Sequence, residues 1–383
     1  MKIILAIDSF KGCLSSAQVE KAAQEGILKI YPSAEVIALP IADGGEGTLE
    51  AMLSANKAIK AVSIVAHDPL MRPIQASYGM SVDGKTAILE MAQTCGLTLL
   101  SVAERNPLMT TSFGLGEQIA DAIDKGCRQL IIAVGGSATN DASIGMLQAL
   151  GYRFYDKSGK PVANNAKALM QTEHIDLTLA KRLPLDCCIT VAVDVTNPLY
   201  GEHGASFVFA PQKGASPHMV EELDKGLRHF AEVVSKCLGQ DYSNIPGTGA
   251  AGGVGFALKS FMNAHFKSGI DLLLDALDFD RLIIDADLII TGEGAIDRQT
   301  LMGKVPFGIL KRSVSSRKDV IAIAGKVTDK ELLLSGGFKD VLCINRPDVD
   351  LVLALKPDYA YAQVVKTVQK LMKSFPLQPV LSL

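Results

Sequence analysis

Carboxylates, hydroxyls and lysines in this sequence stand in or beside glycine-rich loops, a combination that suits a nucleotide and the metal ion bound to its phosphates. Glycine lets backbone N–H groups close around an anion, and a helix that begins behind such a loop adds a favourable dipole. Four segments have this character: ADGGEGT (42–48), VGGSATNDAS (134–143), GTGAAGGVG (247–255) and TGEGAIDRQTLMGK (291–304). They predict a nucleotide–Mg²⁺ site assembled from distant parts of the chain.

Each loop also has a purely structural interpretation. In the first loop Asp43 could cap the next helix with Glu46 at the capping-box position, but three glycines within four residues exceed what a cap requires. In the second, Gly135 and Gly136 precede four polar side chains, which favours contact with phosphate or substrate over a simple helix start. The last loop surrounds one strand end with two carboxylates and two cations, which favours a binding role.

Two segments match nucleotide-binding patterns by letter only. GTGAAGGVG contains G-x-G-x-x-G, but it follows the residues Asn-Ile-Pro rather than a strand, so we interpret it as a loop leading into a helix. GMSVDGKT (79–86) fits the P-loop pattern, yet its second glycine and its lysine fall in a turn between two predicted strands. We therefore expect a hairpin turn there.

Single charged residues at the ends of predicted strands are further candidates. Asp8, with Lys11 three residues on, could hold a metal and an anion, or it could simply cap the turn. Asp194 ends CCITVAV, where it could accept a hydroxyl proton, hold Mg²⁺ or start a turn. Arg72, in HDPLMRP, could clamp a substrate carboxylate through two hydrogen bonds or form a surface ion pair.

Strand-like and helix-like segments alternate along the chain, which predicts an α/β protein. The opening strand–loop–helix pattern, with strands expected at 2–8 and 35–39, returns in the last hundred residues, whereas 59–91 reads as strands of an antiparallel or mixed sheet. We therefore expect one domain built from both termini (1–66 plus 285–383). A second domain (67–284) would be inserted into it, with the active site in the cleft between them.

Composition excludes several classes of protein. The 383 residues include 48% apolar and 21% charged residues, a net charge of −3 and no tryptophan, so neither non-specific nucleic-acid binding nor an aromatic stacking platform is expected. No apolar run reaches membrane-spanning length, and the start of the chain reads as a strand rather than a signal peptide. Seven scattered cysteines without a C-x-x-C pair favour reduced thiols in the cytoplasm.

In order along the chain, several stretches resemble the bacterial glycerate kinase family, in particular its glycerate 2-kinase branch. They are AIDSFKGCLSS, PIADGGEGT, HDPLMRP, TSFGLGEQI, AVGGSATNDASIGML, DVTNPLYGEHGAS, GTGAAGGVGFAL and TGEGAIDRQTLMGKVPFGI. They span residues 6–309, so the resemblance covers most of the chain and is highly specific.

The resemblance implies a Rossmann-like or flavodoxin-like parallel-sheet domain with a second, mixed α/β domain inserted. It implies transfer of the γ-phosphoryl group of ATP, with Mg²⁺, to the 2-hydroxyl of D-glycerate, by a monomer or homodimer. The sequence leaves open the 3-hydroxyl, another small hydroxy acid as substrate, and a metabolite-binding regulator without enzymatic activity.

The candidate residues fall into four groups. They are Asp194, Asp8, Lys11 and Lys304 for catalysis; Arg72, Ser137, Asp43 and Asn140 for glycerate; Gly44, Gly45, Gly135, Gly136, Thr139, Gly292 and Gly294 for the phosphates; and Asp194, Glu293 and Asp297 for Mg²⁺.

Overall fold

The structure, a computed structural model, describes residues 1–39, 41, 47–55, 58–180, 184 and 186–375. The hypotheses for Asp43, Gly44 and Gly45 therefore lie outside the described residues. The chain divides into two compact units: a terminal unit, Met1–Asp43 with Ile270–Leu383, and an inserted unit, Gly44–Gly269. Each is described separately below.

The terminal unit is built on a five-stranded, wholly parallel sheet with the order β13-β12-β11-β1-β2. Its strands are β1 (Lys2–Ile7), β2 (Glu35–Ala38), β11 (Leu288–Ile296), β12 (Val320–Val327) and β13 (Asp340–Cys343). The central strands read as continuous apolar runs, such as KIILAI in β1, because parallel sheets are covered on both faces.

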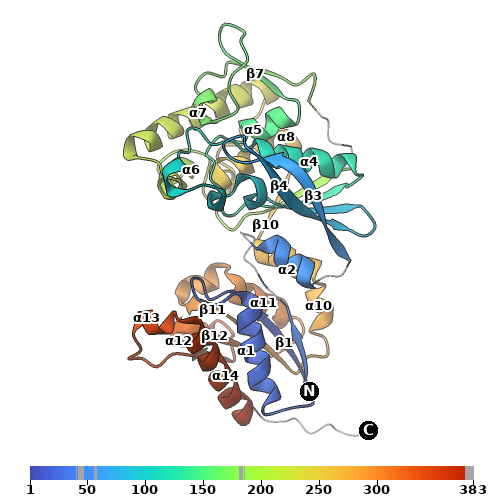
Figure 1. The fold of residues 1–383 in the computed structure, drawn as a ribbon, viewed down its shortest axis with the longest axis vertical. Coiled ribbons are helices and arrows are strands. Elements are labelled where there is room, and N and C mark those ends of the chain that lie inside the picture. The colour runs from blue at the N-terminus through green and yellow to red at the C-terminus, as the bar shows by residue number, and fades with distance from the viewer. Residues whose placement is uncertain (40, 42–46, 56–57, 181–183, 185, 376–383) are drawn as a thin grey trace. The chain divides into compact units, whose positions relative to one another are not determined.

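Helices from both ends of the chain cover one face of this sheet. The helices α1 (Ser16–Leu28) and α14 (Pro357–Ser374) lie side by side, as Figure 1 shows, and share a buried core with β1, β11 and β12. A capping box formed by Ser15 and Gln18 starts α1. The helix α11 (Val305–Val314) also packs against the sheet. The remaining helical segments are α9 (Gly269–Ala276), α10 (Phe279–Leu282), η6 (Arg298–Met302), α12 (Lys330–Ser335) and α13 (Leu351–Ala354).

The inserted unit contains a six-stranded mixed sheet with the order β10-β9-β6-β5-β4-β3. Its strands are β3 (Ile59–His67), β4 (Pro73–Ser81), β5 (Thr86–Glu90), β6 (Gln129–Ala133), β9 (Cys188–Ala192) and β10 (His265–Lys267). The last four run parallel, whereas β3, β4 and β5 are antiparallel neighbours. A small pair, β7 (Arg153–Tyr155) with β8 (His174–Asp176), stands apart.

Seven α-helices and five short 3-10 turns complete the described part of the inserted unit. The helices are α2 (Thr48–Ala55), α3 (Ala92–Cys95), α4 (Phe113–Asp124), α5 (Ile144–Ala149), α6 (Ala205–Phe209), α7 (Pro217–Leu238) and α8 (Val254–Met262). The turns are η1 (Leu97–Leu99), η2 (Val102–Glu104), η3 (Ala166–Ala168), η4 (Pro211–Lys213) and η5 (Ala250–Gly252). Within the described residues, no helix combines the length and hydropathy that crossing a bilayer requires.

The α/β fold with an inserted second domain, predicted from the sequence, is confirmed. The boundaries between the units along the chain differ from those we expected. The division falls at 43/44 and 269/270, not at 66/67 and 284/285. The strand β3 pairs along its whole length with β4, so it belongs to the inserted sheet. The segment GMSVDGKT forms the hairpin turn between β4 and β5, as expected, with Gly84 at a φ of 70°.

The strand order of the terminal sheet reverses at one point. From β1 the chain moves to β2 on one side, whereas β11, β12 and β13 progress in the opposite direction. Ligands of open parallel sheets bind outside the carboxyl ends of the strands, at the point where the direction reverses. That point lies between β1 and β11, where Ile7 is paired with Gly292.

Substitution of Gly292 tests how tightly this edge is packed. A Cβ atom at Gly292 would lie 2.2 Å from the carbonyl oxygen of Ile323, whereas one at Gly294 would have its nearest neighbour at 3.5 Å. We expect Gly292→Ala to lower the free energy of unfolding by about 1–3 kcal/mol, because the neighbouring strand must move. Gly294→Ala is the matched control and should leave the urea midpoint nearly unchanged; equal losses would contradict this account.

Candidate active site

Two carboxylates lie on neighbouring chain segments where the strand order of the terminal sheet reverses. Asp8 follows β1 and is only 7% exposed, and its backbone N–H donates to the carbonyl oxygen of Gly292 at 2.9 Å. Glu293 lies on the adjacent strand β11, with 13% of its side chain exposed. Burial, followed by weaker effects that include the negative charge of Asp8, raises the pKa of Glu293. The two acids therefore interact across the β1–β11 pair.

The segment after β11 folds back to surround Glu293. The Thr300 hydroxyl donates to Glu293 Oε1 at 2.8 Å, and Lys304 Nζ lies 3.6 Å from Glu293 Oε2. Asp297 caps η6 by accepting from the Gln299 N–H at 2.8 Å, while its own N–H donates to the Thr300 hydroxyl. Glu293 thus has a lysine and a hydroxyl as partners, three residues before the end of β11.

The oxygen donors of this edge suit Mg²⁺. Carboxylates are hard ligands, and Mg²⁺ in nucleotide sites is held by one or two of them together with water and phosphate oxygens. The described residues contain no group of three or more His, Cys, Asp or Glu side chains that could hold a metal ion. Asp8 and Glu293 fit that role, whereas Asp297 is engaged in capping η6. Asp194, our third candidate ligand, belongs to the inserted unit.

The two glycines of TGEG differ in the space that a side chain would have at each position. Gly292 has no room for a side chain beside β12, whereas Gly294 lies opposite the backbone nitrogen of Lys11, 3.5 Å from the position of an added Cβ. At Gly294 an added Cβ would make only ordinary van der Waals contact with the loop that follows β1. Lys11 itself is exposed on that loop.

In the inserted unit, the loop 134–143 follows β6 and is held by the buried carboxylate of Asp141. This carboxylate accepts hydrogen bonds from the Ser112 N–H, the Ser112 hydroxyl and the N–H groups of Ser143 and Gly145, at 2.8–3.3 Å. Its complete burial raises its pKa, and these hydrogen bonds oppose that shift. Asp141 is therefore the anchor of the loop, in addition to the helix-capping role that the sequence suggested.

Buried polar atoms without partners gather in the same loop. Thr139 Oγ1, Asn140 Oδ1 and Ser143 Oγ are each buried with no hydrogen-bond partner. Ala142 and Ser143 both adopt positive φ, at 44° and 58°. Unmet hydrogen-bonding capacity and backbone strain of this kind concentrate at functional sites. The loop thus has the physical character of a ligand-binding segment.

A buried lysine completes this loop from another part of the chain. Lys213, in η4, is 2% exposed and donates to Ser137 Oγ at 2.9 Å and to the carbonyl oxygen of Thr139 at 2.7 Å. Burial lowers its pKa to about 7, against the opposing effect of the Asp141 charge. Sequence reasoning missed Lys213, because nothing in PQKG distinguishes a buried lysine from a solvated one.

Two more acids end strands of the inserted sheet. Asp194 is exposed after β9 and accepts the Gly269 N–H at 2.9 Å. Glu90, at the end of β5, is 2% exposed and accepts the N–H groups of Gly47 and Leu49, so it caps α2 behind the segment ADGGEGT. Sequence reasoning also missed Glu90, although its position at a strand end is the same signal that singled out Asp8 and Asp194.

The glycine-rich loop 247–255 leads into α8, as expected, and its glycines allow backbones to approach closely. An added Cβ at Gly252 would lie 2.2 Å from the Thr139 carbonyl oxygen, and the Gly252 carbonyl accepts the Ala142 N–H at 3.0 Å. This loop therefore supports the loop 134–143 from behind.

Comparison with known proteins identifies the family of this chain. The profile of the glycerate kinase family matches residues 3–375. The chain belongs to the glycerate kinase family. It is 47% identical to a glycerate 2-kinase of Escherichia coli (strain K12) over 330 residues, 86% of each chain, and 45% identical to a glycerate kinase of Bacillus subtilis (strain 168) over 328 residues, again 86% of each. A crystal structure described as a candidate glycerate kinase 2 from Salmonella typhimurium LT2 superposes with a TM-score of 0.85 at 42% identity, covering 98% of both chains.

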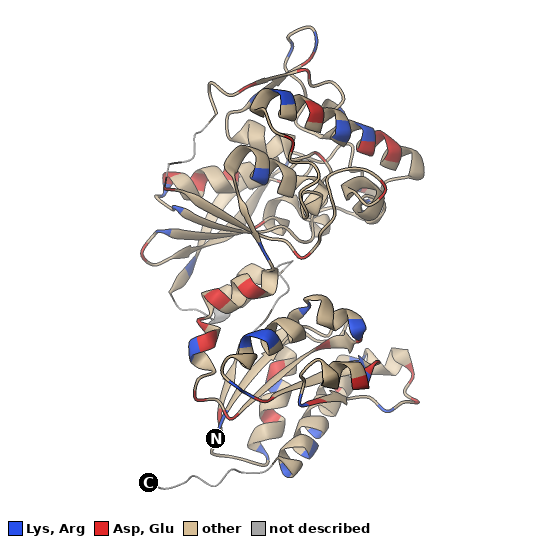
Figure 2. Ribbon diagram, turned by 180° about the vertical axis from the view of Figure 1, so that it is seen from behind, with Lys and Arg blue, Asp and Glu red and all other residues tan. Residues whose placement is uncertain are grey.

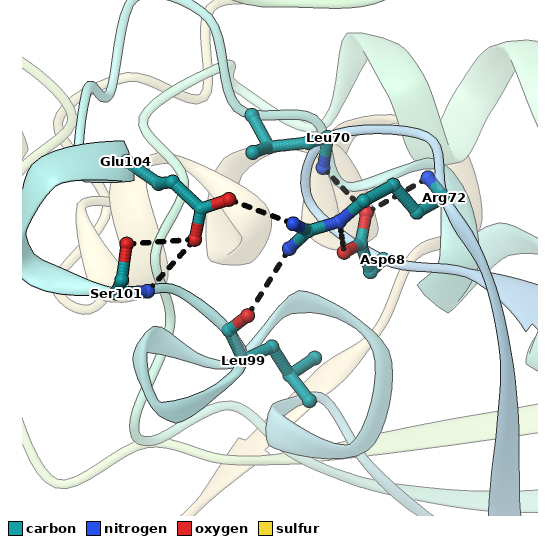
Figure 3. A network of polar contacts seen from close by, with 6 residues as sticks. All are labelled: Asp68, Leu70, Arg72, Leu99, Ser101 and Glu104. Carbon is teal, nitrogen blue, oxygen red and sulfur yellow. Dashed lines mark hydrogen bonds and ion pairs between the residues drawn. The ribbon is translucent and has the colours of Figure 1, made fainter.

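The family resemblance found in the sequence is thereby confirmed, but one residue interpretation needs correction. Arg72, assigned to the glycerate carboxylate, is held by protein acceptors: its Nε by Asp68, its Nη1 by Glu104 Oε1 at 2.7 Å and its Nη2 by the Leu99 carbonyl at 3.2 Å (Figure 3). Two carboxylates against one guanidinium leave a net negative charge, which repels an anionic substrate. Arg72 therefore ties the turn before β4 to η2.

Removal of the Asp141 charge should loosen the loop 134–143. Asp141→Asn replaces an acceptor with an amide whose N–H groups face the donors of Ser112, Ser143 and Gly145, so we expect a loss of about 2–4 kcal/mol in the free energy of unfolding. Urea denaturation measures it. Asp156→Asn is the matched control, because Asp156 accepts the same kinds of bond from Ser158 and Lys160 in a solvated turn, and its loss should be small.

The raised pKa of Glu293 predicts a pH-dependent gain of stability on its neutralisation. Because the folded-state pKa lies above the unfolded value, the ionised carboxylate destabilises the fold once the pH rises through the folded-state pKa. Glu293→Gln should therefore raise the melting temperature at pH 8 and not at pH 4. Glu25, whose pKa is lowered by Lys29, is the control: Glu25→Gln should give no gain at pH 8. A gain for Glu293→Gln that does not depend on pH would contradict the charge argument.

Proposed function

We propose that this chain transfers the γ-phosphoryl group of ATP to D-glycerate, at the 2-hydroxyl, giving 2-phosphoglycerate and ADP. The observation that carries the proposal is the pair Asp8 and Glu293, with Lys304, at the reversal point of a parallel sheet. A strand-end site with carboxylates for Mg²⁺ and a lysine for phosphate is what phosphoryl transfer requires, because that reaction depends on positioning and charge neutralisation. The names of the relatives supply the acceptor, and the Escherichia coli relative supplies the 2-position.

We assign the residues of the terminal unit to binding of the nucleotide and its Mg²⁺. Asp8 and Glu293 would hold Mg²⁺, which neutralises negative charge on the phosphates when bound. Lys304 and Lys11 provide positive charge, and Gly294, which has no side chain, is assigned to the approach of the phosphates. Asp297 supports this set through Thr300, which donates to Glu293.

We assign residues of the inserted unit mainly to the phosphoryl acceptor, D-glycerate. Ser137 and Asn140 are assigned to D-glycerate. The phosphates of ATP are assigned to Gly135, Gly136 and Thr139 of the same loop. Asp194 is assigned to the acceptor hydroxyl, whose proton it would accept as general base, with Asp8 as the alternative. The exposure of Asp194 at the end of β9 supports this role, because a general base must be accessible to substrate.

We place the reaction in the cytoplasm, where ATP is available. The structure has all seven cysteines as free thiols, which agrees with a reducing compartment. We propose a monomer or a homodimer as the active form, which light scattering coupled to size exclusion would decide.

Asp194→Asn tests the assignment of the general base. We expect kcat with D-glycerate and ATP to fall by about 10²–10⁴-fold, because proton transfer in the transition state is lost. ADP formation measures this rate. Asp186→Asn is the matched control: Asp186 is an exposed acid at the other end of the same strand, paired with Arg128 at 3.4 Å, and its replacement should leave kcat unchanged.

Phosphorus NMR of the product, together with a panel of hydroxy acids, separates the remaining alternatives. A 2-phosphoglycerate signal supports the proposal, and a 3-phosphoglycerate signal or preference for another hydroxy acid corrects the acceptor. Absence of any product from the wild-type protein would favour a metabolite-binding regulator. A full-rate Asp194→Asn enzyme would move the base to Asp8.

A further inference from the structure

The buried ammonium of Lys213 is a feature that the phosphoryl-transfer scheme above does not use. It reaches the loop 134–143 from η4, far away in the sequence, and contacts the Ser137 hydroxyl and the Thr139 carbonyl at 2.9 and 2.7 Å. A lysine that is 2% exposed is rare unless it is paired or serves a site. Its contacts are a neutral hydroxyl and a neutral carbonyl, and within the described part of the chain no carboxylate forms a direct ion pair with it.

We propose that Lys213 is a positioning residue that makes the loop 134–143 a carboxylate-binding site, by orienting the Ser137 hydroxyl and by placing a positive charge behind it. The inference rests on the proposed function in one respect: it takes the bound carboxylate to be that of D-glycerate. It gives the loop a source of positive charge in place of Arg72, whose charge is neutralised by Asp68 and Glu104.

Hydrogen-bond chemistry fixes the orientation of the Ser137 hydroxyl. When Lys213 is protonated, its ammonium group has three donors and no acceptor, so Ser137 Oγ accepts from it. The hydroxyl proton is therefore directed away from Lys213 and is available to an external acceptor. Among the described residues no acceptor takes this proton, so a ligand oxygen would find a donor already oriented.

The neighbouring atoms match the groups of a hydroxy acid. Thr139 Oγ1, a donor, and Asn140 Oδ1, an acceptor, are both buried without partners. The Asn140 amide nitrogen donates to the Ser206 hydroxyl at 3.0 Å, which fixes Oδ1 as the unused atom. Hydroxyl donors suit a carboxylate, and an amide oxygen suits the adjacent alcohol.

The charge of Lys213 can respond to a ligand near neutral pH. Its pKa is about 7 because burial disfavours the ammonium, and Asp141 is the charged group whose field opposes that effect. Asp141 makes its own hydrogen bonds to Ser112, Ser143 and Gly145 rather than to Lys213. A bound carboxylate favours the charged ammonium, so binding at pH 8 should be accompanied by proton uptake.

Kinetics of Lys213→Met provide the first test. We expect the KM for D-glycerate to rise by about 10–100-fold, the loss expected for a charge-assisted interaction, with the KM for ATP and kcat changed little. Lys213→Arg keeps the charge and should recover part of the affinity. Lys259→Met is the matched control. Lys259 is partly buried and, like Lys213, donates to a backbone carbonyl, that of Ala264 at 3.1 Å, so its replacement should leave the kinetics like those of the wild type. Equal losses for ATP and D-glycerate would show that Lys213 only stabilises the fold.

Proton uptake provides the second test, and it works on the wild-type protein even where Lys213→Met fails to fold. Titration calorimetry with D-glycerate at pH 8, in two buffers of different ionisation enthalpy, should show uptake of a fraction of a proton. Uptake should be absent with glycerol, which lacks the carboxylate, and with Lys213→Met. Binding of D-glycerate without proton uptake overturns the inference.

The same measurements separate this inference from the proposed function. A wild-type protein that binds D-glycerate with proton uptake but forms no ADP would refute the kinase activity and keep the role of Lys213. Turnover in which the KM for D-glycerate does not depend on Lys213 would keep the activity and refute the inference.

Discussion

The pairing of β1 with β11 is the constraint on which the terminal unit depends. Residues 3–7 and 288–292 lie in parallel register, so the first strand of the protein becomes the neighbour of one synthesised almost three hundred residues later. This pairing aligns Asp8 with Glu293, and it sets the point where strand order reverses. Figure 2, in which Lys and Arg are blue and Asp and Glu are red, shows charged residues of both signs distributed over the helices and loops of the unit that contains both termini. Without this pairing, neither carboxylate would have the other as a neighbour.

The inserted unit relies on buried charges of both signs. Asp141 is satisfied by hydrogen bonds from its own and a neighbouring loop, whereas Lys213 donates to a hydroxyl and a carbonyl. Several hydrogen-bond donors stabilise a buried carboxylate. A buried ammonium group with only neutral partners is stabilised further when an anion binds beside it. The pair therefore gives the loop 134–143 both rigidity and affinity for an anion.

Much of this architecture could be predicted from the sequence, because hydrophobic periodicity and turn residues report local structure directly. The hydrophobic pattern predicts a strand over 59–67 and helices over 113–124 and 305–314, and the structure has these bounds. The pattern also predicts a helix over 141–150, but this helix begins at Ile144, because Ala142 and Ser143 adopt left-handed conformations while Asp141 accepts its hydrogen bonds. Those conformations depend on partners elsewhere in the chain.

Residue roles that depend on tertiary contacts could not be predicted from the sequence. The strand-end signal found Asp8, Asp194 and Glu293, since strand ends are visible in the pattern. It gave no means of knowing that Arg72 has two acids as neighbours or that Lys213 is buried. The position of the unit boundaries was missed for a similar reason, because β3 is assigned by its pairing with β4 rather than by its composition.

The discontinuous terminal unit has a consequence for biosynthesis. All strands of the inserted sheet lie between residues 59 and 267, so they are synthesised before β11. Until β11 is made, β1 has no partner on one side, and an unpaired apolar strand edge is prone to aggregation.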